Sequence, residues 1–183
     1  MQSWHALAGP FLVNAYNYFR LKTGVVHWDK VVWEQWALPR ACFVLWLVVR
    51  GKLKTKDRLR FLSADVTCVL YSQAEESHAH LFFSCSWTSL LWSRITSWLR
   101  INRQMSSLSS ALWGLKFGKG LDSRMQRVAL AITIYSIWHE RNGRVFDKHR
   151  NSVDVVFWKF QILFYTIFYF HVKDPSLLNV ISY

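Results

Sequence analysis

The sequence predicts a mainly α-helical fold, a small helical domain arranged around a loop that looks like a degenerate zinc knuckle. Apolar residues recur at intervals of three and four along much of the chain, which is the spacing of one face of an α-helix. Pro39 and Gly51 bracket one such segment in the positions typical of a helix start and a helix end. Cys68, His80 and Cys85 stand at ligand-like spacing between the helical segments.

The first helical segments are predicted between residues 29 and 61. A helical pattern begins at Asp29, and a second helix covers residues 38–51, with Pro39 in its first turn and Gly51 at its C-cap. Apolar side chains surround nearly the whole circumference of this second helix, which predicts a central, buried element. They are Phe43, Leu45, Trp46, Leu47 and Val49. Thr55 can cap a short helix over residues 56–61.

Three longer segments follow toward the C-terminus. Apolar residues at helix spacing predict helices over residues 85–100 and 122–142, and the serine- and glycine-rich stretch between them predicts a loop. The last segment, residues 153–172, contains an uninterrupted apolar run, Ile162–Phe170, that is shorter than the roughly 20 residues needed to cross a bilayer as a helix. We therefore expect a buried helix packed on the long one, and association with a membrane is the less favoured alternative.

The stretch from Cys68 to Cys85 carries the only pattern that indicates site chemistry. It reads Cys-x2-Tyr-x8-His-x4-Cys, which would supply four ligands to zinc if position 71 were cysteine. Tyr71 is a poor replacement, because a phenol with a pKa of about 10 stays protonated at neutral pH. His78 is the nearby alternative fourth ligand, provided that the chain is not helical there. The pattern predicts a zinc site of low occupancy.

The charge of the chain favours a polyanionic partner. Lys and Arg number 23 against 11 Asp and Glu, which gives a net charge of +12. RNA or DNA, held through the phosphate backbone, fits this excess, although a basic surface that merely keeps an aromatic-rich chain soluble fits it as well. The candidate phosphate contacts lie just before the cysteine loop, where a solvated helix face is the alternative interpretation. They are Lys52, Lys54, Lys56, Arg58 and Arg60.

Short sequence patterns on both sides of the loop match one known family. They are Ala15-Tyr16, Val32-Trp33, Pro39-Arg40, the run from Phe43 to Leu47, the run from Leu53 to Leu59, Glu76-Ser77, the run from His80 to Cys85, Trp92, and the Trp-x-x-Arg-Asn pattern from Trp138 to Asn142. In these patterns the chain resembles the reverse-transcriptase zinc-binding domain that follows the polymerase in plant non-LTR (LINE-type) retrotransposons.

The resemblance implies that Cys68, His80 and Cys85 are the zinc ligands and that Tyr71 occupies the position of a lost fourth ligand. We divide the chain into a leader without a predicted fold (1–28), a domain like this reverse-transcriptase zinc-binding domain (29–104), a loop (105–120), a C-terminal helical extension that packs on the domain (121–172), and a tail (173–183).

The remaining features bear on compartment and catalysis. Three cysteines are too few for a disulfide framework and no signal peptide is recognisable, so we expect a protein of the nucleus or cytoplasm that is not secreted. Neither the paired aspartates of a polymerase nor the carboxylate cluster of an RNase H is recognisable, so we expect no enzyme and no small-molecule substrate. The sequence therefore predicts a non-catalytic nucleic-acid-binding accessory domain of retrotransposon origin. The alternative is a vestigial, structural interaction module with neither a metal nor a nucleic-acid partner.

Overall fold

The computed structural model describes residues 26, 28–61, 65–71, 73–102, 105–115, 118 and 120–172. Most of the leader and all of the tail lie outside these residues. The described part is helical without a strand, so the prediction of a mainly α fold is confirmed. The elements are α2 (Asp29–Val32), α3 (Pro39–Val49), the 3-10 helix η2 (Lys56–Leu59), the π-helical turn η3 (His80–Ser84), α4 (Ser86–Trp98), α5 (Leu108–Leu115), α6 (Leu121–Phe146) and α7 (Val153–His171).

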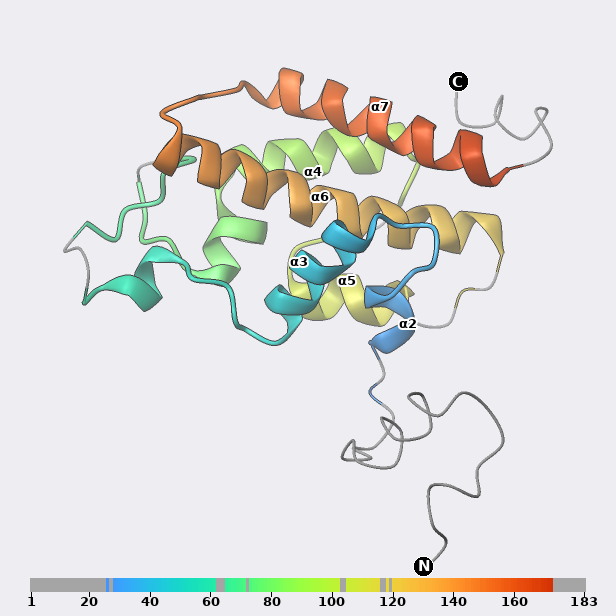
Figure 1. The fold of residues 1–183 in the computed structure, drawn as a ribbon, viewed down its shortest axis with the longest axis horizontal. Coiled ribbons are helices and arrows are strands. Elements are labelled where there is room, and N and C mark those ends of the chain that lie inside the picture. Colours follow the sequence, from blue (N-terminus) through green and yellow to red (C-terminus); the bar gives the residue numbers. More distant parts are fainter. Residues whose placement is uncertain are drawn as a thin grey trace, which may run out of the picture.

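Helix α6 is the element around which the others pack. Figure 1 shows it running through the middle of the fold, with α4 and α7 on one side and α3 and α5 on the other. Its residues 128–134 are all buried, which is possible only for a helix covered on every side. The sequence pattern predicts a helix here, but it does not show that α6 is the centre of the core.

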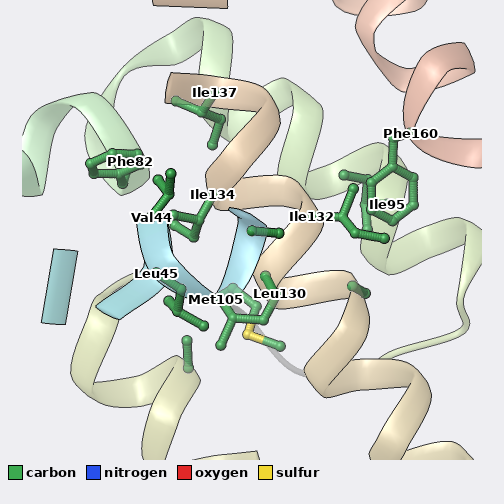
Figure 2. Close-up of a cluster of buried hydrophobic side chains, with 14 of the residues drawn as sticks. Val44, Leu45, Phe82, Ile95, Met105, Leu130, Ile132, Ile134, Ile137 and Phe160 are labelled. Atoms are coloured by element: carbon green, nitrogen blue, oxygen red, sulfur yellow. The ribbon is translucent and has the colours of Figure 1, made fainter. Parts of the chain in front are cut away.

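The core joins all the larger helices. Figure 2 shows Leu130, Ile132 and Ile134 of α6 lying among side chains of α3, α4 and α7. Helix α7 contributes its buried aromatic face, and the ring of Trp98 packs edge-on against Phe160 and its neighbours. The prediction that the last segment packs on the long helix is therefore confirmed. By length and composition, α7 is also the one helix among the described residues that could cross a membrane, a test that core helices of soluble proteins also pass.

Helix α3 begins and ends where the sequence predicts, but it is not buried all round. Gly51 has a φ of +59°, the left-handed conformation that suits glycine after a helix end, and the Lys52 N–H closes the end by donating to the Leu47 carbonyl at 2.7 Å. The inner face buries Val44 and Leu45 against the core. Phe43 is half exposed, so the prediction of a fully surrounded helix is wrong for the outer face.

Helix α5 occupies part of the stretch that was predicted to be a loop. The loop prediction for residues 105–120 is therefore wrong over Leu108–Leu115. Ser107 explains the difference, because its hydroxyl accepts a hydrogen bond from the Ser110 N–H at 3.1 Å and so caps the helix start. Ala111 and Leu112 are buried, which gives this short helix an apolar face against the core. Serines that suggest a loop in sequence thus act partly as a helix cap.

Candidate metal centre

Cys68 is presented by a folded-back loop. An antiparallel bridge joins Thr67 to Glu75, and the Cys68 N–H donates to the Ala74 carbonyl at 2.9 Å. The backbone N–H groups of Leu70 and Tyr71 lie close enough to the Cys68 sulfur to favour its thiolate form. The side chain is fully buried, so its sulfur faces the inside of the loop rather than solvent.

His80 and Cys85 are brought together by one π-helical turn. The Cys85 N–H donates to the His80 carbonyl at 2.8 Å, a bond from residue i+5 to residue i. Because the hydrogen bond of this wider turn joins residue i+5 to residue i, it brings His80 and Cys85 next to each other although four residues separate them. Both side chains can then reach one metal ion. Cys85 also forms the N-cap of α4, next to the free N–H groups of that helix.

The three side chains converge on one point. Their ligand atoms, the two sulfurs and a ring nitrogen of His80, all lie within 4.8 Å of one another. Donors of a tetrahedral zinc site are about 3.5–3.8 Å apart, so only a small contraction separates this group from zinc geometry. Among the described residues, the His80 Nε2 is the one buried side-chain polar atom without a hydrogen-bond partner. A buried nitrogen without a partner beside two thiols fits a metal ligand.

The two thiols share a proton in a way that prepares the site for a cation. The Cys68 thiol donates a hydrogen bond to Cys85, and this bond, with the N–H groups of Trp87 and Thr88, lowers the pKa of Cys85 to about 6. The same hydrogen bond and burial raise the pKa of Cys68. The hydrogen bond therefore favours the thiolate form of Cys85, at the start of α4, and the protonated form of Cys68.

A fourth protein ligand is not among the described histidine, cysteine, aspartate and glutamate side chains of this group. Tyr71 is 41% exposed, at the surface of the loop. The His78 Nε2–H donates to the Leu53 carbonyl at 2.9 Å, so His78 has another partner and does not take the fourth position. The donor set is thus two sulfurs and one imidazole nitrogen, which suits zinc with one further position open. Cys42 lies in α3, buried and apart from this group, as a small apolar side chain would be.

Helix α6 braces the loop through charged residues that the sequence pattern does not identify as structural. Arg141 donates to the fully buried carboxylate of Glu76, with its Nη2 at 2.8 Å from Oε1. Arg144 donates to the carbonyls of Val69 and Leu70 at 3.1 and 3.0 Å, inside the loop that carries Cys68. The Trp-x-x-Arg-Asn pattern includes Arg141, but the sequence does not show that Arg141 pairs with Glu76.

The basic run before the loop divides into two groups in the structure. Lys52 and Lys54 are exposed, and neither has a carboxylate partner among the described residues. The other three are engaged: Lys56 with Asp65 at 2.7 Å, Arg60 with Glu75 at 2.6 Å, and Arg58 with the Gly51 carbonyl. The hydrogen bond from Lys56 also lowers the pKa of Asp65 to about 2.

Comparison with known proteins adds one finding. Residues 12–92 match a family model described as zinc-binding in reverse transcriptase. The matched range contains Cys68, His80 and Cys85 and ends within α4, so Arg141 and Arg144 of α6 lie beyond it. No curated protein and no solved structure matches the chain.

Proposed function

We propose, from the match of residues 12–92 to the family model described as zinc-binding in reverse transcriptase, that this chain is a non-catalytic accessory domain that binds RNA or DNA. The domain would hold template or target strands through their phosphates, beside a polymerase of the plant LINE type. The matched family describes a zinc-binding region only, which supports an accessory role rather than catalysis.

The distribution of charge is the observation that carries this proposal. All four glutamates of the chain, Glu34, Glu75, Glu76 and Glu140, are paired with arginines. Four exposed cations of α3 and the loop after it have no carboxylate partner among the described residues. They are Arg40, Arg50, Lys52 and Lys54. Positive charge on α3 and the loop after it therefore remains without an ion-pair partner among the described residues, as phosphate binding requires.

Zinc has a structural part in this proposal. A zinc ion held by Cys68, His80 and Cys85 would add folding free energy, because the unfolded chain does not present the three ligands together. The chain itself supplies three donors, so we expect weaker zinc binding and lower occupancy than in a site with four protein ligands.

The second candidate is a vestigial module that folds without a metal or a nucleic-acid partner. The observation that favours it is the position of Tyr71, whose side chain lies at the surface instead of completing the ligand set. In that case the helical core alone would maintain the fold, and the basic face would bind nothing specifically.

Salt-dependent titration of the purified chain with single-stranded RNA and DNA tests the proposal. Each phosphate contact contributes roughly 0.7–0.9 to the slope of log K against log salt concentration. The triple variant Arg50→Ser, Lys52→Ser, Lys54→Ser should therefore flatten the slope by about 2–3. No binding by the wild type at low salt would favour the vestigial module instead.

A control variant of equal charge separates a defined face from bulk charge. It replaces three exposed cations that lie outside α3 and the loop after it, two between α6 and α7 and one within α7. They are Lys148, Arg150 and Lys159. The control should leave the slope nearly unchanged. Equal flattening by both triple variants would show that net charge, and not the α3 face, determines binding.

A further inference from the structure

The outer face of α3 combines aromatic rings with unpaired cations. Arg40, Phe43, Trp46 and Arg50 follow one another at intervals of three, three and four residues, so they lie along one side of the helix. The distance from Arg40 to Arg50 along the helix axis is about 15 Å, because each residue adds about 1.5 Å. The sequence pattern predicted these rings to be core, whereas the structure leaves Phe43 half exposed and Trp46 only partly buried against the core.

Three rings form a continuous cluster on this face. Trp46 lies between Phe43, at 5.8 Å between ring centroids, and Trp33, at 6.4 Å. Phe43 is 51% exposed and Trp33 is 48% exposed, so both outer rings present much of their surface to solvent. The ring planes of Phe43 and Trp33 are inclined to that of Trp46 by 27° and 37°, so the three rings form a contiguous apolar surface on which a planar ligand can stack.

The charges around the cluster favour an anionic ligand. Arg50 lies one helical turn beyond Trp46, and Lys52 and Lys54 follow in the next loop. The nearest acidic side chain in sequence, Glu34, is buried and neutralised by Arg127 at 2.7 Å and by Arg124. The guanidinium of Arg40 lies 5.3 Å from the centroid of Tyr135 and is held at the edge of the face. Aromatic rings with cations along the same side of the helix match the chemistry of a nucleic-acid strand.

We propose that Trp33, Phe43 and Trp46 form a platform on which bases of single-stranded RNA or DNA stack, while Arg40 and Arg50 contact the neighbouring phosphates. This inference rests on the proposed nucleic-acid-binding function and specifies its ligand as single-stranded. Stacking needs an exposed base face, which a duplex does not offer because its bases already stack on one another. The platform therefore selects unpaired strands without reading their sequence.

The test compares two probes of equal length and charge. One is an oligothymidylate, and the other has the same phosphates but abasic sites in place of the bases. The wild-type chain should bind the oligothymidylate more tightly, with quenching of tryptophan fluorescence. Phe43→Ala should weaken binding of the oligothymidylate by about 5- to 100-fold, the range that base–aromatic stacking gives on alanine substitution, and should leave binding of the abasic probe unchanged.

Two further variants make the result specific. Phe146→Ala removes a phenylalanine that is 72% exposed at the end of α6, and it should change neither affinity. Phe43→Tyr keeps a stacking ring and should retain the preference for bases. Equal binding of both probes by the wild type would overturn the platform while leaving phosphate binding intact, whereas binding of neither probe would overturn both proposals. A change from dimer to monomer in Phe43→Ala, without a change in probe affinity, would assign the face to a second copy of the chain and overturn the platform.

Discussion

Replacing Glu76 with glutamine should destabilise the fold strongly, because it leaves a buried arginine without its counter-charge. The Glu76 carboxylate is fully buried and accepts hydrogen bonds from Arg141 Nη2 at 2.8 Å, from Arg141 Nε at 3.1 Å and from the Lys56 backbone N–H at 2.9 Å. Glutamine has nearly the same shape but no charge, and its amide group would face guanidinium donors. Breaking one partner of a buried ion pair costs about 3–5 kcal/mol, against a total unfolding free energy of roughly 5–15 kcal/mol for a domain.

The neighbouring residue provides a matched control. Glu75 forms an ion pair with Arg60 at 2.6 Å, but the two side chains are 61% and 59% exposed. Solvent screens such a pair, so Glu75→Gln should cost only about 0–1 kcal/mol. Urea denaturation followed by tryptophan fluorescence measures both variants, since the chain has 11 tryptophans. The expected result is a large fall in the urea midpoint for Glu76→Gln and almost none for Glu75→Gln.

Removal of both charges distinguishes an unpaired charge from lost packing. The double variant Glu76→Gln, Arg141→Met has no charge left in the buried site, so it should recover a substantial part of the loss. If Glu76→Gln costs no more than Glu75→Gln, then the pair is not buried as the structure shows, and the argument that α6 braces the loop is wrong. If the double variant is less stable than Glu76→Gln, then the aliphatic and ring contacts of Arg141, including its position 5.0 Å from the Trp138 centroid, matter more than its charge.

Three shorter predictions concern the metal and the core. Tyr71→Cys should raise zinc occupancy to one ion per chain in native mass spectrometry by completing a tetrahedral set, and full occupancy in the wild type would refute the idea of a lost ligand. Above about pH 7, the logarithm of the zinc association constant, measured by chelator competition, should rise by about one per pH unit. The reason is that Cys68, with its raised pKa, must lose a proton to bind zinc, whereas Cys85, with a pKa of about 6, is already a thiolate. A pH-independent association constant would contradict this. Trp92→Ala should cost about 3–5 kcal/mol in urea denaturation, since this ring is buried and its Nε1–H donates to the Phe82 carbonyl at 2.8 Å. Trp46→Ala should cost less, because this ring is only partly buried against the core.

The helices and the approach of His80 to Cys85 were predictable because their signals are local. Pro39 and Gly51 mark the ends of α3 through backbone conformations that these two residues favour in any context. Likewise, the four residues between His80 and Cys85 fit a single turn, whatever surrounds it. Signals of this kind do not depend on the rest of the fold, so the sequence alone predicts them.

The buried ion pairs were not predictable because they join distant parts of the chain. Glu76 and Arg141 are 65 positions apart, and helix spacing places Arg141 four residues after the buried Ile137 without showing which acidic side chain reaches it. A charged residue usually faces solvent, and only the packing of the cysteine loop on α6 gives Arg141 a buried partner. The same reason explains the basic run, where Lys56 and Arg60 find carboxylates at Asp65 and Glu75 that sequence spacing does not reveal.

Hydrogen bonds join the loop before His80 to the segment that carries Lys54. Through them a bound metal ion would have a role in the proposed function without any chemistry of its own. The Leu53 carbonyl accepts from His78, and the Asp57 N–H donates to the Glu76 carbonyl at 3.1 Å. The segment that carries Lys54 therefore rests on residues 76–78, immediately before the ligand His80. A metal ion that fixes His80 also fixes this segment, and an ordered segment loses less conformational entropy when it binds phosphate. On this argument a zinc ion held by Cys68, His80 and Cys85 would increase the proposed nucleic-acid affinity by holding the basic residues in place.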